Sequence, residues 1–466
     1  MAKHIYIAIE VARRELDSRL LLAVEVAARG GTVLLARRAD LQEAVPALPP
    51  GVLVDTNLPV QSPDPQRRAG LLRERAKRGI ANVCMDEEGL VYPGCKTYRA
   101  MRTSEETVGL TDLFVVWGNA SARCFSDLPS ERVLVAGNPR LDLLREPASG
   151  LYDTEVRRIR RRYGHFVLFA SNFAIANHAA GGGFFSGQAQ AYGWRDDETV
   201  DEFLHDRQAF VEREMRRFVS ALHTTAETMP EGCQIVVRPH PADNEATWQD
   251  IIAGFPRCHV SKEGAVVPWL LAASALVHSG CTTGLEAHLA GTPAFSLRDI
   301  SFPIETPLDL PDAVSCYLPD PTYLFSDTAR FRASATDPFA GPVGGYVEGA
   351  LSAPRIADAI LDLAPETSEG VPRAIAKAGR RRQLRLAIGG HRLVHRLRSL
   401  AHRGEGYSAS LEARRYYLDK FSSARAFDVV GKAGRLCALM PGANGVRIRR
   451  FGPSAVMLEP SGSSSS

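Results

Sequence analysis

The chain alternates short apolar runs with helical segments, and this alternation constrains its fold more than any other feature. In the first third, apolar runs at residues 4–10, 32–36, 51–55, 82–85, 112–118 and 132–137 predict strands, and the segments between them, such as 13–28 and 65–78, predict helices. Strands interleaved with helices favour a parallel sheet covered on both faces. The pattern restarts with strands at 166–170, 234–237, 259–261, 275–278 and 292–296. We therefore expect two α/β domains that face each other across a cleft, with a ligand at the carboxyl ends of the strands.

The length of the chain agrees with this division, because 466 residues are too many for one typical core. We assign residues 1–150 to a first domain, 160–345 to a second domain, and 346–466 to a C-terminal extension of helices, a basic tail and a disordered end. The disordered end is the low-complexity run Ser461–Ser466. Residues 174–195 are rich in Gly, Ala and aromatic side chains, and we expect a long loop that is either functional or disordered.

The basic tail concentrates the positive charge of the chain. Between Arg373 and Arg403 there are ten Lys and Arg and no Asp or Glu, although the whole chain carries only +3. Leucines interleave with these charges, as in a basic amphipathic helix on an anionic membrane surface. A basic helix packed on an acidic core explains the pattern equally well. Nucleic acid is a weaker interpretation, because aromatic residues are nearly absent and no binding module surrounds the run.

Composition places the protein among soluble globular proteins. Apolar residues make up 45% of the chain and charged residues 23%, and no apolar run reaches the roughly 18 residues of a membrane span. The eight cysteines are scattered without a CxxC pair, which argues against a zinc site and against a dense disulfide framework. We expect reduced thiols and a cytoplasmic protein.

The stretch from Ala275 to Pro293 reads as a buried strand, a turn rich in hydroxyls and glycines, and a helix. The first N–H groups of such a helix lack internal partners and favour an anion. Hydroxyls of the turn add donors, and Gly280 and Gly284 would let a ligand approach the backbone closely, so we predict a phosphate cradle made of Ser279, Gly280, Thr282 and Thr283. An ordinary turn capped by one of the two threonines is the alternative.

Two further turns, at the ends of predicted strands, contain candidate catalytic and phosphate-binding residues. In the second domain, a strand ends at Arg238, and His240 follows between two prolines. At this position Arg can bind a phosphate, and His can donate a proton to a leaving oxygen. In the first domain, Asp86, Glu87 and Glu88 follow a strand directly. Three adjacent carboxylates repel one another, so a buried one would have a raised pKa, as a general base or nucleophile requires. A structural histidine and a solvated acidic turn are the alternatives.

Two weaker candidates lie at equivalent strand ends. Arg140 follows the last strand of the first domain and could reach the cleft. Asn172 follows the first strand of the second domain and could bind a nucleotide or sugar hydroxyl. No metal-binding DxD spacing is present, and we predict no metal and no cofactor.

Taken in order along the chain, these motifs resemble a known family. Asp86–Gly89 resembles an acidic-acidic-Gly motif, His240-Pro241 an HP motif, and Ser279–Thr283 a Ser/Thr phosphate motif. Together they look like glycosyltransferases with two Rossmann-like domains (GT-B type) that use CMP-activated sialic acids or Kdo. With Trp117-Gly118 and Gly137–Leu144, the pattern is similar to the bacterial surface carbohydrate biosynthesis proteins. The resemblance covers residues 1–300, and leaves the tail and the 174–195 segment unexplained.

The resemblance implies a role for each residue. Asp86 or Glu87 would be the catalytic carboxylate, and His240 would assist departure of the CMP phosphate, with Arg238 beside it. The cradle would hold that phosphate, and a Glu placed like Glu286 binds the nucleotide ribose in many related transferases. Glu88 and Arg140 would lie in the cleft or near the acceptor, and which of the three acids is catalytic stays open.

The implied function is transfer of a sugar in capsule or lipopolysaccharide synthesis. The donor would be a CMP-sugar, such as an activated Kdo or nonulosonic acid, and the acceptor a glycan or lipid-linked glycan. The enzyme would be cytoplasmic, with Arg373–Arg403 holding it on the inner membrane face, and nucleic acid is not an expected partner. Inverting and retaining chemistry both remain open. The alternatives are a transferase that uses a UDP-sugar or CDP-glycerol, a nucleotide-sugar 2-epimerase, and a non-catalytic partner protein.

Overall fold

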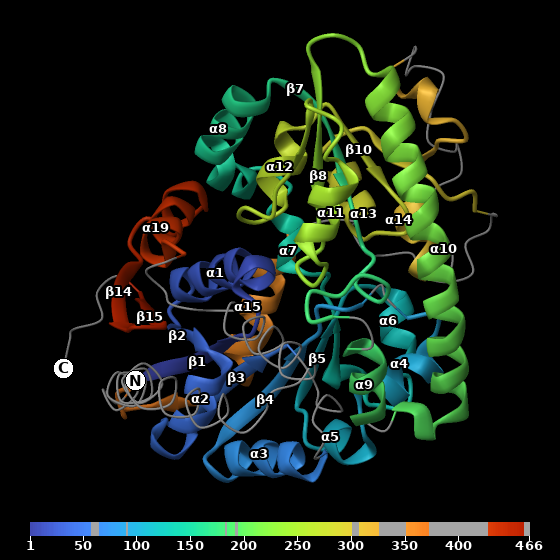
Figure 1. Ribbon diagram of the computed structural model, residues 1–466. Coiled ribbons are helices and arrows are strands. Elements are labelled where there is room, and N and C mark those ends of the chain that lie inside the picture. The colour runs from blue at the N-terminus through green and yellow to red at the C-terminus, as the bar shows by residue number, and fades with distance from the viewer. Residues whose placement is uncertain are drawn as a thin grey trace, which may run out of the picture.

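The computed structural model describes residues 1–56, 65–89, 92–181, 184–191, 194–300, 307–325, 351–371 and 427–460. It contains two sheets with helices on both faces, and the second sheet lies above the first in Figure 1. The two predicted parallel sheets are therefore confirmed. The tail Arg373–Arg403 and the run Ser461–Ser466 lie outside the described residues.

The first sheet has a parallel centre. Its parallel strands are β1 (Ala2–Ile9), β2 (Thr32–Arg37), β3 (Gly51–Asp55), β4 (Ile80–Met85), β5 (Leu113–Val116) and β6 (Val133–Val135), in the order β2-β1-β3-β4-β5-β6. Side chains alternate across β1, as the two-residue period of a strand requires. Ile5 and Ile7 pack in the core that contains α1 (Ala12–Ala28), whereas Tyr6 and Ala8 pack in the core that contains α2 (Arg38–Ala44). The remaining helices of this domain are α3 (Pro65–Lys77), α4 (Cys95–Arg102), α5 (Glu105–Gly109), α6 (Asn119–Arg123) and α7 (Pro139–Asp142).

The second sheet is parallel throughout, in the order β12-β11-β10-β7-β8-β9. Its strands are β7 (His165–Ala170), β8 (Cys233–Arg238), β9 (Cys258–Val260), β10 (Ala275–His278), β11 (Ala294–Ser296) and β12 (Cys316–Tyr317). From β7 the chain runs to β8 and β9, then crosses to β10 on the other side of β7. Ligands of such sheets bind where the strand order reverses, outside the carboxyl ends of the strands. The turns after β7 and β10, which carry Asn172 and the cradle, lie at that point.

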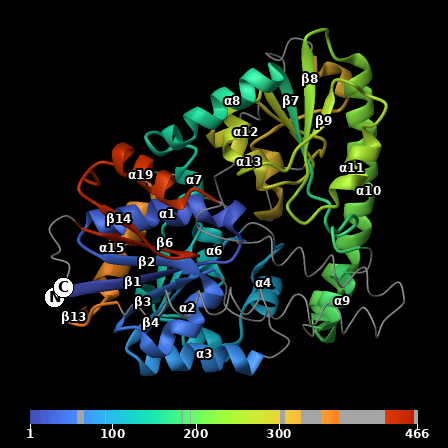
Figure 2. The ribbon, with the colours of Figure 1, turned by 60° about the vertical axis from the view of Figure 1, so that its left-hand side comes forward.

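The helices of the second domain are α8 (Asp153–Tyr163), α9 (Phe184–Ala191), α10 (Glu198–Thr228), α11 (Glu245–Ile251), α12 (Val267–Ala272), α13 (Thr283–Leu289) and α14 (Leu310–Ala313). Residues 174–195 were expected to form a loop, but they contain α9. The long helix α10 runs along one side of the molecule (Figures 1 and 2). Its first turns carry Val200 and Leu204, which pack with Met101 of the first domain.

The described C-terminal segment packs on the first domain and contains strands, which were not predicted, as well as helices. Helices α15 (Ser352–Leu363) and α19 (Val429–Leu439) pack against α1. β13 (Glu366–Thr367) pairs antiparallel with β1, and the hairpin of β14 (Arg447–Gly452) and β15 (Ala455–Glu459) adds to the edge of β2 (Figure 2). Asp142 holds the start of α15 by accepting hydrogen bonds from Ser352 N (2.9 Å) and Ala353 N (2.8 Å). Pairing over more than 400 residues leaves no local sequence signal, which is why the expectation differed.

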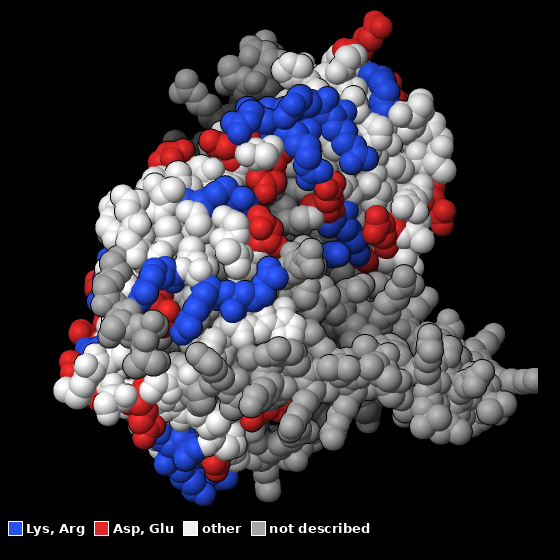
Figure 3. Space-filling model, turned by 90° about the vertical axis from the view of Figure 1, so that its left-hand side faces the viewer, with Lys and Arg blue, Asp and Glu red and all other residues white. Residues whose placement is uncertain are grey.

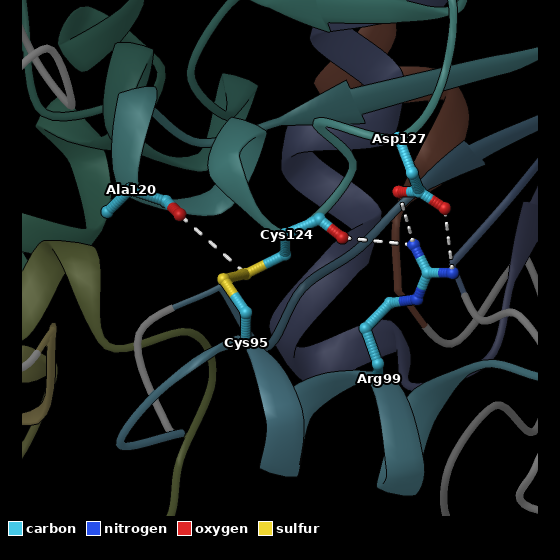
Figure 4. The surroundings of a disulfide bond; sticks show 5 residues. All are labelled: Cys95, Arg99, Ala120, Cys124 and Asp127. Carbon is cyan, nitrogen blue, oxygen red and sulfur yellow. Dashed lines mark hydrogen bonds and ion pairs between the residues drawn. A yellow bond between two sulfur atoms is a disulfide. The ribbon is translucent and has the colours of Figure 1, made fainter.

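One pair of cysteines is bonded, so the expectation of reduced thiols is wrong for these two. Cys95 opens α4, and Cys124 directly follows α6 (Figure 4). The chain folds these helices side by side, although 29 positions separate the cysteines in sequence. The other six cysteines are free thiols. Among the described helices, none is both long enough and apolar enough to cross a membrane.

Candidate active site

A cavity of about 200 Å³ lies between the two domains, where strands of both sheets end. The first domain lines it with Arg13, Arg14, Asp17, Glu87, Glu88, Trp117, Arg140, Leu143 and Tyr152. The second domain contributes Asn172, Arg238, His240, Lys262, Cys281, Thr282, Thr283, Glu286 and the apolar segment 264–267, among others. Nine of the twelve residues predicted from the sequence therefore lie around one cavity. Asp86, Ser279 and Gly280 do not line it.

Glu87 is the most buried carboxylate of the acidic turn, with 4% of its surface exposed. Arg19, itself fully buried, approaches Glu87 Oε1 to 3.0 Å, and Asn138 Nδ2 donates to Oε2 at 3.4 Å. Arg140 lies 3.9 Å from the same Oε2. Burial nevertheless raises the pKa of Glu87, because desolvation, to which the Glu15 carboxylate adds, outweighs the guanidinium groups of Arg19, Arg140 and Arg14. Glu87 is thus a carboxyl group with the raised pKa that a general base uses.

Glu88 behaves in the opposite way. Burial would raise its pKa, but the Arg14 guanidinium, which donates to Oε1, lowers the pKa of Glu88 below its ordinary value. Its side chain keeps 26% exposure. Glu88 therefore stays ionised near neutrality and pairs with a cation that also lines the cavity.

Asp86 points away from this cavity. Arg102 Nη2 donates to its Oδ1 at 2.6 Å, and the carboxylate lines a separate cavity on the other side of the turn. The backbone N–H of Glu88 also donates to Oδ1. A role for Asp86 as the base of the main cavity does not fit this position, and Glu87 is the better placed of the two.

Arg238 lies at the end of β8, and neutral backbone oxygens hold it in place. Its guanidinium donates to Glu263 O (2.9 Å) and to Gly264 O (2.5 Å), and it stacks over the ring of Trp269. Burial lowers the pKa of Arg238 to about 9, with Arg13 adding to the effect, so it remains cationic at neutral pH. Because its partners carry no net charge, its positive charge is available to an anion in the cavity.

His240 has a defined tautomer. Its Nδ1 accepts a hydrogen bond from Ala242 N at 3.2 Å, so in the neutral ring the proton is on Nε2. Its backbone N–H donates to Ser171 Oγ, which in turn donates to Asp243 Oδ2 at 2.6 Å and fixes the turn. Burial, with Arg14 nearby, lowers the pKa of His240 to about 4. The ring is therefore neutral at pH 7 and keeps one N–H donor.

The cradle divides into two parts. Thr282 and Thr283 line the cavity at the start of α13, and the Thr282 hydroxyl makes no capping hydrogen bond. Ser279 lies behind them and donates to Glu214 Oε2 at 2.6 Å. Thr283 Oγ1 contacts Cys281 Sγ at 3.0 Å. The two threonines can meet a ligand, whereas Ser279 anchors the turn to α10.

The glycines of the cradle serve internal packing. Gly280 has a left-handed φ of 62°, its N–H donates to Asp312 Oδ1, and a Cβ there would lie 2.9 Å from Arg298 Nη1. A Cβ on Gly284 would lie 2.5 Å from His278 Nε2. We expected both glycines to open the backbone to a ligand, but side chains of the protein occupy that space. The signal was misread because Arg298 beside Gly280 and Pro311 beside Gly284 come from outside this stretch, whereas His278 belongs to the strand that precedes the turn.

Arg140 joins the two domains across the cavity. Its Nε lies 2.9 Å from Glu286 Oε1, on α13 of the second domain, and its guanidinium stacks on Trp117 of the first domain. Glu286 is 3% exposed and was expected to bind a ribose. In this structure Arg140 is its partner.

Sequence reasoning missed several residues of the cavity. Arg13 and Arg14 follow β1, Lys262 follows β9, and Tyr152 donates to Asp17 Oδ2 at 2.9 Å. The strand-end rule that found His240 would also have found Arg13, Arg14 and Lys262. Tyr152 and Asp17 carry no such signal. Within the described ranges, no group of three or more His, Cys, Asp and Glu is arranged to hold a metal ion.

No protein-family model and no curated protein matches the chain. Among solved structures it is similar to the UDP-GlcNAc 2-epimerase of Neisseria meningitidis bound to UDP-GlcNAc, with 12% identity and a TM-score of 0.47 over 78% of this chain and 100% of that one. It is also similar to S. aureus MnaA with UDP (12%, TM-score 0.48, 80% and 100%). The wall teichoic acid polymerase TagF with CDPG has 11% identity and a TM-score of 0.42, over 78% and 88%. The fold class rests on this chain's own two sheets, and its chemistry on its own residues.

Proposed function

We propose that the chain is a glycosyltransferase that takes a sugar from a nucleotide donor in surface polysaccharide synthesis. One observation carries this proposal. A buried carboxylate with a raised pKa, Glu87, shares a cavity with an anion-holding group from the other domain, made of Arg238, His240 and the two threonines. Sugar transfer needs both, because a proton must leave the acceptor hydroxyl while negative charge develops on the leaving phosphate.

The second domain would hold the leaving phosphate. Arg238 supplies the charge, and Nε2–H of His240 and the hydroxyl of Thr282 supply hydrogen bonds. A phosphate beside His240 favours the protonated ring, so its pKa of about 4 would rise when the donor binds. Glu87, on the opposite wall, would take the proton of the acceptor in an inverting reaction.

We propose a CMP-activated ulosonic acid as the donor. The motif resemblance supports the CMP, and the charge of the cavity supports an acidic sugar. Arg13 is exposed at its rim, and Lys262 donates to Asp243 O and Pro241 O, both neutral groups. A sugar carboxylate near these cations would gain charge-assisted hydrogen bonds. We propose that the reaction runs without a metal.

A basic face supports the further proposal of attachment to an anionic membrane. It consists of Arg157, Arg158, Arg160, Arg161 and Arg162 of α8, Arg435 of α19, and Arg447, Arg449 and Arg450 of β14. The five α8 arginines are exposed, and Arg435 meets Glu155 of α8 at 4.0 Å. Figure 3 looks at this side, where Lys and Arg gather over the upper part. Juxtaposed cations of this kind attract anionic lipids.

Nucleotide binding tests the proposal first. CMP at 100 times its Kd would add about 2.7 kcal/mol to the free energy of unfolding, and we expect a higher Tm with CMP and CTP. The matched control is Arg217→Ala, an exposed arginine on α10, which should bind CMP as the wild type does. Stabilisation by UDP or CDP-glycerol alone would overturn the donor assignment. Conversion of a nucleotide sugar to its epimer without any acceptor would overturn the transferase.

A further inference from the structure

A second cavity, of about 170 Å³, lies in the first domain on the other side of the acidic turn. Its walls include Asp86, Gly89, Tyr92, Tyr98, Trp117 and Cys124. None of the residues that hold the proposed donor phosphate line it. It is therefore distinct from the proposed phosphate site.

The acidic turn and Trp117 form the partition between the two cavities. Trp117 lines both, and its Nε1 donates to Asp86 O at 2.7 Å. Gly89 packs directly on the indole, and a Cβ at this position would lie 2.6 Å from the ring. Along this one turn, Asp86 faces the second cavity, whereas Glu87 and Glu88 face the main one. A group bound in the second cavity is thus one side chain away from the proposed base.

The lining of the second cavity suits a sugar ring. Two aromatic rings, Tyr92 and Tyr98, offer faces and edges on which the C–H face of a pyranose can pack, and the indole of Trp117, covered by Gly89 and Arg140, closes the wall behind them. Tyr92 meets Tyr98 edge to face at 5.4 Å. Asp86 places a buried carboxylate in this wall, and its charge is compensated by Arg102 at 2.6 Å. The cavity therefore favours a hydroxylated, uncharged ring over a phosphate.

A covalent bond fixes the wall of this cavity. The disulfide between Cys95 and Cys124 ties the first turn of α4 to the end of α6, and both cysteines line the cavity. Arg99, one turn further along α4, donates to Cys124 O at 3.0 Å and pairs with Asp127 (Figure 4). Preformed walls reduce the ordering cost of binding, which matters for weakly bound sugars.

We propose that the second cavity is the subsite for the terminal saccharide of the acceptor glycan. The inference rests on the proposed transferase function and deepens it. With the acceptor ring in the second cavity and the donor in the main one, the acidic turn separates the two substrates, and the proposal requires the reacting hydroxyl to pass the edge of this turn. Glu87 and Glu88 then lie between the two substrates, where the proton must be removed.

Saturation-transfer NMR on the full chain tests the subsite. The probes are the methyl glycosides of glucose, galactose, N-acetylglucosamine, N-acetylgalactosamine and rhamnose, without nucleotide. We expect at least one glycoside to show saturation transfer and to lose it in Gly94→Phe. Gly94 lines the cavity, its backbone is extended (φ −175°), and a Cβ there meets nothing within 4 Å, so the new ring can occupy the cavity without strain.

The control is Gly109→Phe, at an open position outside the cavity, which should keep the signal. Tyr92→Ala, which removes one ring from the lining, is the second test variant if Gly94→Phe does not fold, and it should also weaken the saturation transfer. Absence of binding to the wild type, or binding that survives both variants, overturns the subsite. CMP binding is measured on the same samples. CMP stabilisation without glycoside binding overturns the subsite alone, whereas glycoside binding without CMP stabilisation overturns the proposed donor and leaves a saccharide site.

Discussion

The two walls of the main cavity are built on opposite electrostatic plans. On the first-domain wall, the two acids of the turn that line the cavity each meet an arginine: Glu87 meets Arg19, and Glu88 meets Arg14. On the second-domain wall, Arg238 and Lys262 are held by backbone oxygens that carry no net charge. The first wall tunes proton affinity and the second leaves positive charge for an anion.

Neighbouring acids on the first wall illustrate the tuning. The pKa of Glu87 is raised by burial, whereas Arg14 lowers that of Glu88, although the two residues are consecutive. Environments that push two carboxyl groups apart in this way separate a proton acceptor from a permanently charged group. We therefore expect variants of the first wall to change the rate of reaction, and variants of the second wall to change the affinity for the donor.

The largest effect should come from Glu87→Gln. The amide keeps the shape of the side chain but cannot accept a proton, so kcat should fall by about 10² to 10⁴. The Kd for CMP should stay within about twofold of the wild-type value, because the residues proposed to bind the phosphate lie on the other wall. Kinetics of sugar transfer and titration with CMP measure the two quantities. A large loss of CMP affinity with unchanged kcat would reverse the roles of the walls.

Arg238→Ala should produce the next largest effect, with the opposite signature. A hydrogen bond to a charged group contributes about 1.5–3 kcal/mol, so the Kd for CMP should rise by about 10- to 100-fold. Calorimetric titration measures this change, and Arg217→Ala is the matched control on the surface of α10. If both variants bind CMP like the wild type, the second wall does not hold the phosphate.

The pH dependence should separate Glu87 from His240. A general base works when deprotonated, so a raised pKa of Glu87 means that kcat/KM falls with decreasing pH at a value above the usual ~4.3 of a glutamate. His240, with a pKa of about 4, stays neutral in the free protein from pH 5 to 8, so its titration should not change kcat/KM in this pH range. Rate profiles of the wild type and His240→Gln measure this. A limb that disappears in His240→Gln would contradict the assignment.

A smaller contrast lies within the cradle itself. Thr282→Val removes a hydroxyl that faces the cavity, and a neutral hydrogen bond of about 0.5–1.5 kcal/mol corresponds to a 2- to 10-fold rise in the Kd for CMP. Ser279→Ala leaves Glu214 without its donor, so it should lower the free energy of unfolding by about 1–3 kcal/mol and leave the Kd unchanged. Denaturant unfolding and CMP titration of both variants provide the comparison. Equal affinity losses would place Ser279 in the site.

The smallest expected effect is that of metal removal. If the two walls supply the base and the phosphate ligands, the initial rate in EDTA should equal the rate in buffer. Assays after chelation, and with added Mg²⁺ or Mn²⁺, check this. Loss of activity in EDTA that Mg²⁺ restores would assign part of the phosphate binding to a metal.

The sequence pattern predicted those features that depend on neighbouring residues, namely the strands of the second sheet and the polar residues at strand ends. The strands of the second sheet are consecutive in the sequence, and β7 to β11 could be predicted one after another from their apolar runs. Glu87, Glu88, Arg238 and His240 were found because parallel strands bring their carboxyl ends to one edge. These residues all line the main cavity.

Remote contacts decided the rest. Whether Asp86 or Glu87 faces the cavity depends on the course of one turn against Trp117, 31 positions away. The space beside Gly280 is filled by Arg298, and the edge of β2 by β15. The hydrophobic period of a strand specifies its two faces and not its partner, so neither the returning hairpin nor the Cys95–Cys124 pair could be read from the sequence.

The returning C-terminal segment sets an order for folding during synthesis. All strands of the second sheet are complete at Tyr317, whereas the first sheet still lacks β15, which ends at Glu459. A chain made from its N-terminus can therefore close the second domain first, while the edge of β2 stays unpaired. Open strand edges invite pairing with other chains. The part of the protein that is synthesised first is the part that is protected last.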